Sequence, residues 1–193
     1  MKLVFASGNK KKTEEIIKLL PPAIELLNLI DIGISEDIPE TGSTFKANAL
    51  QKAKYVFDST GLNCFADDSG LEVESLDMRP GIYSARFAGE QKNDEANIDL
   101  LLEQMNGVLN RKAQFKTAIA LILDGGTYYF EGVIKGVITE KRQGNNGFGY
   151  DPVFKADGFE KSFAEISIDE KNKISHRAIA VNALTAFLQM HKA

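Results

Sequence analysis

A long alternating segment that ends in a tight turn constrains this chain more than any other feature. Every second side chain from Ala113 to Leu123 is apolar or Thr, Asp124-Gly125-Gly126 follows, and a second strand-like run ends at Ile138. This pattern predicts a long β-hairpin. Before it, short strand-like runs alternate with helical ones. We therefore predict an α/β (mixed α+β) fold, in which a mixed sheet is flanked by helices.

Periodicity and capping residues predict the remaining elements. Apolar residues at helical spacing indicate helices over about 10–20, 44–58, 94–105 and 177–191. Short apolar runs indicate strands over 3–6, 26–32, 63–67 and 71–74, the last two separated by an Asp-Ser-Gly turn. Ser43 is the expected N-cap of the second helix. No linker, repeat or low-complexity tract divides the chain, so residues 1–193 are predicted to form a single domain.

Composition limits the partners and the compartment. The chain has 23 basic and 27 acidic residues, a net charge of −4, which excludes a protein that coats nucleic acid. No apolar run approaches the roughly 20 residues of a membrane helix. Cys64 is the only cysteine, so no internal disulfide can form. We expect a cytoplasmic protein with no membrane or nucleic-acid partner.

The first candidate site lies between a predicted strand and a helix. It reads Ser7-Gly8-Asn9-Lys10-Lys11-Lys12, where Gly8 permits a tight turn and the helix N-terminus attracts anions. A polyphosphate would fit there, with Lys12 and Lys10 adding positive charge. The spacing is not that of a P-loop. The alternative is a capped helix followed by solvated lysines.

A second candidate site follows an apolar strand at Ala66-Asp67-Asp68-Ser69-Gly70. Neighbouring strand residues point to opposite faces, so the two carboxylates would face different surroundings. Carboxylates suit Mg²⁺, and one could accept a proton from an attacking water. An ordinary Asp-Ser-Gly turn is the alternative. Glu40 could complete a metal site, and Asn48 and Lys52 share one side of the next helix.

Two further segments could bind a flat ligand. Residues 144–152 place three glycines around Phe148 and Tyr150, so that backbone and a stacked aromatic ring could both reach a base. Near the last helix, Lys171 is followed by His176 and Arg177, which are donors for a keto oxygen or a phosphate, and Ser175 could cap that helix. A flexible loop and surface polar residues are the respective alternatives.

Together these motifs resemble those of the inosine triphosphate pyrophosphatase family. The resemblance covers the whole chain and rests on seven motifs in order: Ser7-Gly8-Asn9-x-x-Lys12, Glu40-Thr41-Gly42, Asn48 with Lys52, Ala66-Asp67-Asp68-Ser69-Gly70, Pro80-Gly81-Ile82-Tyr83-Ser84-Ala85-Arg86, Phe148-Gly149-Tyr150-Asp151-Pro152 and Ser175-His176-Arg177. It implies an elongated mixed sheet with two lobes around a central cleft, and a homodimer.

The resemblance also implies a role for each site residue. The triphosphate would be bound by Ser7, Gly8, Asn9, Lys10, Lys11, Lys12 and Lys52. Asp68 would be the catalytic proton acceptor and a Mg²⁺ ligand together with Glu40, and Ser69 would touch the substrate. The base would be held by Phe148, Gly149, Tyr150, Asp151, Lys171, His176 and Arg177.

The activity that the resemblance implies is the Mg²⁺-dependent hydrolysis of ITP, dITP and XTP to the monophosphate and pyrophosphate. A pyrophosphatase for modified pyrimidine triphosphates is the nearest alternative. A nucleotide-sensing module without turnover and a purely structural protein are alternatives from other classes.

Overall fold

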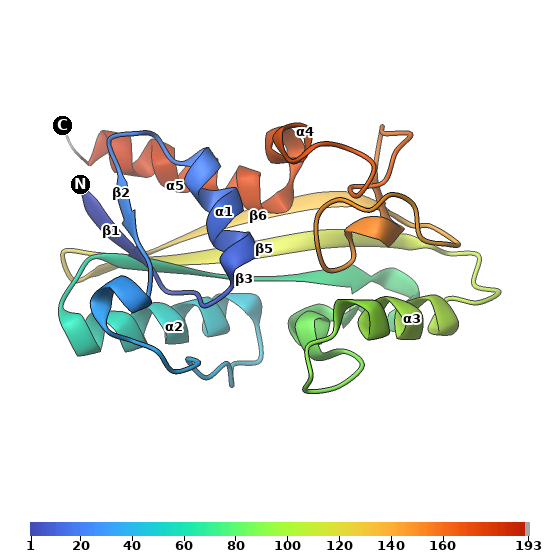
Figure 1. The fold of residues 1–193 in the computed structure, drawn as a ribbon, viewed down its shortest axis with the longest axis horizontal. Helices are drawn as coiled ribbons and strands as arrows, with labels where there is room; N and C mark the ends of the chain where they lie inside the picture. Colours follow the sequence, from blue (N-terminus) through green and yellow to red (C-terminus); the bar gives the residue numbers. More distant parts are fainter. Residues whose placement is uncertain (192–193) are drawn as a thin grey trace. The chain divides into compact units, whose positions relative to one another are not determined.

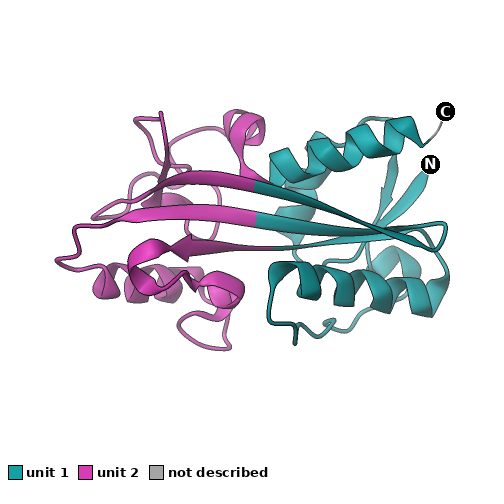
Figure 2. Ribbon diagram, turned by 180° about the vertical axis from the view of Figure 1, so that it is seen from behind, with its two compact units in different colours: residues 1–68, 117–132, 177–193 teal, residues 69–116, 133–176 magenta. Residues whose placement is uncertain are grey.

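The computed structural model describes residues 1–191 and contains two compact units (Figure 2). Unit 1 comprises residues 1–68, 117–132 and 177–193, and unit 2 comprises residues 69–116 and 133–176. Three strands each contribute to both units: β3 (Cys64–Val73), β5 (Lys112–Leu123) and β6 (Gly126–Ile138). Among the described residues, no helix is both long and apolar enough to span a membrane.

The other elements of unit 1 are β1 (Lys2–Phe5), α1 (Lys10–Leu19), β2 (Glu25–Leu27), the 3₁₀ turn η1 (Ile30–Ile32), α2 (Phe45–Thr60) and α5 (His176–Met190). The other elements of unit 2 are η2 (Glu74–Leu76), β4 (Arg79–Pro80), η3 (Gly81–Arg86), α3 (Asp94–Gln104), η4 (Asp151–Val153), β7 (Phe154–Ala156) and α4 (Ile168–Ile174).

The sheet has the strand order β2-β1-β3-β5-β6-β7, and β4 pairs with β3 (Figure 1). β1 is parallel to both β2 and β3, whereas β4 is antiparallel to β3 and β7 is antiparallel to β6. The structure confirms the predicted mixed sheet with flanking helices. It also confirms the hairpin, because Asp124 and Gly125 both adopt positive φ between β5 and β6, as a type I′ hairpin turn requires.

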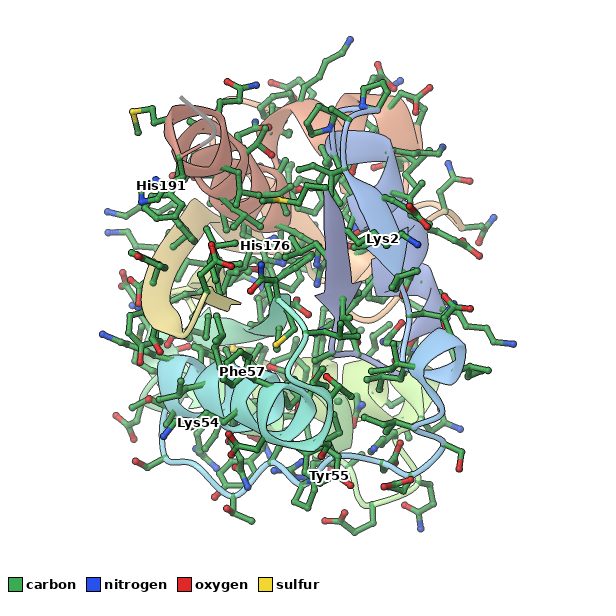
Figure 3. All side chains as sticks on the ribbon, turned by 90° about the vertical axis from the view of Figure 1, so that its left-hand side faces the viewer. Lys2, Lys54, Tyr55, Phe57, His176 and His191 are labelled. Carbon is green, nitrogen blue, oxygen red and sulfur yellow. The ribbon has the colours of Figure 1, made fainter. Side chains whose placement is uncertain are left out.

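In unit 1 the sheet separates two apolar cores. Leu3, Phe5 and Phe65 face α1 and α5, whereas Val4 and Cys64 face α2. Figure 1 shows α1 and α5 on one side of these strands and α2 on the other. Figure 3 shows the same layers end-on, with His191 directly after α5 and Lys54, Tyr55 and Phe57 on α2. This alternation decides which helices each residue of β3 within unit 1 faces.

The structure corrects several predicted elements. The expected turn between residues 67 and 71 is wrong, because β3 continues unbroken through Ser69 and Gly70. The strands that pair with β3 on either side, β1 and β5, override the local turn propensity. The predicted strand over 26–32 is only β2, followed by the turn η1, and the N-cap of α2 is Thr44 rather than Ser43. The short helix α4 was not predicted.

Candidate active site

The topology of unit 1 indicates where a ligand would bind. β1 lies between β2 and β3, α1 connects β1 to β2 on one face, and α2 leads into β3 on the other. The carboxyl ends of β1 and β3 therefore form a topological switch point, the usual ligand site of an open α/β sheet. Residues 6–9 follow β1, and Asp67 and Asp68 lie in β3 just past the paired end of β1.

Asp67 faces α1 and α5. Its carboxylate accepts from Lys12 Nζ at 3.2 Å and 3.1 Å and from Arg177 Nε at 3.3 Å. Arg177 also donates to the buried Glu15 of α1. Glu15 was missed in the sequence, although its place beside Ile16 on the apolar face of the helix was a usable signal.

Asp68 faces α2, as the expected alternation along a strand requires. Its Oδ2 accepts from Asn48 Nδ2 at 2.9 Å. One helical turn later, Lys52 forms an ion pair with Glu40. The resulting charged cluster contains four carboxylates and three cations: Glu15, Glu40, Asp67, Asp68, Lys12, Lys52 and Arg177.

The charged cluster shifts the pKa values of its members. Burial raises the pKa of the Asp68 carboxyl, against the lowering effect of the Lys52 and Lys12 ammonium groups. Burial lowers the pKa of Lys12, against the raising effect of Asp67. For Lys52, burial opposes the charged form, but Glu40 and Asp68 outweigh it and raise the pKa. A buried carboxyl with a raised pKa holds a proton more readily, which suits a proton acceptor.

The start of α1 lies next to the charged cluster through Lys12. Asn9 caps the helix by accepting from Lys12 N at 3.1 Å, and Ser7 Oγ accepts from Asn9 N at 3.3 Å. Lys10 and Lys11 are exposed. Gly8 does not have a positive φ, and a Cβ there would make only an ordinary contact with Asp37. The fold therefore does not require a glycine at this position. A glycine would instead allow a ligand to approach the backbone closely.

In unit 2, Asp151 organises the glycine-rich loop of residues 144–151. Its Oδ2 accepts from Phe148 N at 2.9 Å and from Lys171 Nζ at 2.7 Å, and both members of this ion pair are at most 4% exposed. Lys171 Nζ lies 4.9 Å from the centroid of the half-buried Phe148 ring. The structure thus brings Lys171 to Phe148 and Asp151, which belong to a loop about 20 residues earlier in the sequence.

Other contacts hold the same loop. Gly149 N donates to Asp94 Oδ2 at 2.9 Å, and the buried Tyr150 hydroxyl donates to Ser84 O at 2.8 Å. The side chain of Tyr150 belongs to the core of unit 2, so this residue supports the loop from within. Asp94, at the first turn of α3, was not singled out in the sequence.

The last group of predicted residues divides between the two units. His176 stacks on Phe115, with ring centroids 4.7 Å apart and planes 10° apart. Arg177 was expected beside the base, but its guanidinium binds Asp67 and Glu15 in unit 1. Ser175 lies between α4 and α5, and its N–H continues α4 by donating to Lys171 O. Ser69 follows Asp68 in β3 and is half-buried.

Comparisons with known proteins support a single identification. The model of the Ham1 family matches residues 3–187. A "dITP/XTP pyrophosphatase" of Flavobacterium johnsoniae is 53% identical over 192 residues, covering 100% of both chains, and one of Bacillus subtilis is 43% identical over 96% of each. The solved structure of the Staphylococcus aureus Ham1 protein has a TM-score of 0.91 and 40% identity, covering 99% of this chain and 100% of that one.

Proposed function

The chain belongs to the Ham1 family, and on that premise we propose that it is a nucleoside triphosphate pyrophosphatase. Its substrates would be the deaminated purine nucleotides ITP, dITP and XTP, and its products the monophosphate and pyrophosphate. The names of the relatives support this proposal. The observation that carries it is the charged cluster, in which Lys12, Lys52 and Asp68 gather at the topological switch point of the sheet.

We assign the triphosphate to unit 1. Lys12, Lys52 and the segment Ser7–Lys12, which leads into α1, would balance the charge of the phosphates. Asp68 would orient a water in line with the α-phosphorus and accept its proton. The water oxygen forms a bond to the α-phosphorus as the bond from the α-phosphorus to the bridging oxygen breaks, and the bridging oxygen leaves with pyrophosphate. Such catalysis depends mainly on positioning and electrostatics.

The donor set of the charged cluster fits a divalent cation. Mg²⁺ prefers oxygen ligands and is usually held by one or two carboxylates together with substrate phosphates. Asp68 and Glu40 would provide those carboxylates, and four acids against three cations leave the cluster short of positive charge. Among residues 1–191, no three or more Asp, Glu, His or Cys side chains are grouped so that they could hold a metal ion by themselves. When bound, Mg²⁺ would polarise the phosphate oxygens.

We assign the base to the glycine-rich loop of unit 2. Phe148 would stack on the purine, with Ser69, Gly149, Asp151 and the backbone of Tyr150 completing the contacts on the substrate. Lys171 and His176 would donate to the 6-keto oxygen, which adenine replaces with an amino group. A donor facing another donor is penalised heavily, and such mismatches give discrimination of about 10⁴–10⁵.

A panel of triphosphates tests the substrate class. With Mg²⁺ present, we expect pyrophosphate from ITP, dITP and XTP and little from ATP, with products identified by chromatography. Equal turnover of ATP and ITP would contradict the assignment. Faster turnover of a modified pyrimidine triphosphate would favour that alternative, and binding without any product would favour a nucleotide sensor.

The Asp68→Asn variant tests the catalytic residue. We expect it to fold and to release pyrophosphate about 10²–10⁴ times more slowly, because an amide cannot accept the proton. Circular dichroism and urea unfolding provide the control for folding. Pyrophosphate release at the wild-type rate would remove Asp68 from this role.

The remaining properties follow from the family resemblance. We propose that the protein acts as a homodimer in the cytoplasm and that its partner is a nucleotide and not a nucleic acid. The net charge of −4 supports the last point.

A further inference from the structure

Asn48 connects Asp68 of β3 to the turn of residues 40–42, which carries Glu40. It lies on α2 and is completely buried, and both ends of its side-chain amide are used. Nδ2 donates to Asp68 Oδ2 at 2.9 Å, and Oδ1 accepts from Gly42 N at 2.7 Å. The side chain therefore bridges two segments that contribute to the charged cluster.

The hydrogen-bonding partners determine the orientation of this amide. A backbone N–H can only donate, so Gly42 must face the carbonyl oxygen Oδ1 of Asn48. The NH₂ group then faces Asp68, whose carboxylate accepts. Reversing the amide would place donor against donor at Gly42 and acceptor against acceptor at Asp68, which leaves no alternative arrangement with both bonds formed.

Gly42 is fitted closely against this amide. A Cβ at Gly42 would lie 2.8 Å from Asn48 Oδ1 and 2.8 Å from Ala47 Cβ, although the backbone of Gly42 does not have a positive φ. The glycine is thus required by close approach rather than by backbone conformation. Two residues earlier, Glu40 pairs with Lys52, which lies one turn after Asn48 on the same face of α2.

We infer that Asn48 is a positioning residue for the reaction: it holds the carboxylate of Asp68 in one orientation relative to the Glu40–Gly42 turn. The inference rests on the role proposed above for Asp68. Polar groups that orient a catalytic or metal-binding side chain typically change activity 10–100-fold when they are replaced. The effect should therefore fall on kcat, since Asn48 is not proposed to touch the nucleotide.

The Asn48→Asp variant isolates the bond to Asp68. The new side chain has nearly the same shape and keeps an oxygen for Gly42 N, but it presents an acceptor to Asp68. We expect kcat for ITP to fall about 10–100-fold while KM changes less than about threefold. Asn48→Ala, measured in parallel, should likewise lower kcat with little change in KM. It replaces Asn48→Asp as the test if Asn48→Asp does not fold.

Gln51 offers a matched control on the same helix. Its Oε1 accepts from Thr41 N at 3.0 Å, and its side-chain amide also bonds the Thr41 hydroxyl, so it anchors the same turn. Gln51→Ala should leave kcat within about twofold of wild type. A loss of kcat in Gln51→Ala equal to that in Asn48→Asp would assign the effect to the turn and overturn the inference.

A double-substitution cycle separates this inference from the proposed function. If Asn48 acts through Asp68, adding Asn48→Asp to Asp68→Asn should lower single-turnover rates by less than about twofold further. An active Asp68→Asn enzyme would refute the role of Asp68. An inactive Asp68→Asn enzyme, combined with wild-type kcat in folded Asn48→Asp and Asn48→Ala, would refute only the role of Asn48.

Discussion

At the scale of single residues, the charged cluster depends on ions that are buried together. Asp67 is completely buried and is bound by Lys12 and Arg177, and Arg177 is itself bound by Glu15. Each of these charges would be unfavourable alone in the interior, because burial opposes ionisation unless a partner compensates for it. The integrity of the cluster is therefore a matter of stability as well as of function.

Removing one charge from this network should destabilise the fold. We expect Asp67→Asn to lower the free energy of unfolding by about 3–5 kcal/mol, since Arg177 and Lys12 would lose their shared carboxylate in a buried place. Urea unfolding of the purified variant measures this change. Glu25→Gln is the control, because the Lys2–Glu25 pair is 70% and 58% exposed and such pairs contribute only about 0–1 kcal/mol. Equal effects of both variants would contradict the prediction.

At the scale of elements, the glycine-rich loop is held in shape by its neighbours. Gly147 has a φ of 77°, and a Cβ there would lie 2.1 Å from Asp151 Oδ2, the atom that binds Phe148 N and Lys171 Nζ. The geometry of the loop and the position of Lys171 are thus linked through one carboxylate.

This link predicts an effect of Gly147→Ala on substrate binding. The new methyl group should displace the Asp151 carboxylate and raise KM for ITP by about tenfold or more, while adding the usual strain of about 1–2 kcal/mol for a left-handed residue. Gly158→Ala is the matched control, because Gly158 has a φ of 81° but a Cβ there would meet nothing within 4 Å. Steady-state kinetics compare the KM values of the two variants. An equal KM would show that the contact between the new methyl group and Asp151 does not affect substrate binding.

The segment from Gly81 to Arg86 contains most of the sequence motif 80–86, whose role was not evident from the sequence. Ser84 Oγ accepts from Leu71 N at 2.9 Å and donates to Gly81 O at 2.6 Å, while Ser84 O accepts from Tyr150. Ser84 therefore connects β3 to the glycine-rich loop within unit 2. Its role in the structure is support for the loop.

At the scale of the whole molecule, the two units share their main strands. The boundary falls within β3, β5 and β6, so neither unit has these strands complete. Because each strand is continuous, opening one unit would interrupt a strand that the other also uses. This supports the prediction that the chain behaves as a single folding domain.

Native-state hydrogen exchange tests that prediction. We expect protected amides of β1 in unit 1 and of α3 in unit 2 to reach the same free energy of opening as urea increases, which is the behaviour of one cooperative unit. A separate opening of lower free energy that includes all the amides of one unit would show that the units unfold independently.

Much of the fold was predictable because its signals are local. The β5–β6 hairpin follows from alternation and a two-residue turn, and α1, α2, α3 and α5 follow from helical periodicity and caps. The opposite orientations of Asp67 and Asp68 also follow from a local rule, the alternation of side chains along a strand. The sequence motifs further indicated the family, which the comparisons confirm.

Tertiary structure decided the rest, because it depends on which distant segments meet. The order of strands β2-β1-β3 places Lys12, Asn48 and Asp68 around one switch point, and no sequence spacing encodes that order. It also turned an expected Asp-Ser-Gly turn into the middle of β3 and placed Arg177 on Asp67. Local patterns determine which residues form helices and strands, whereas long-range pairing and burial determine which charges must compensate one another.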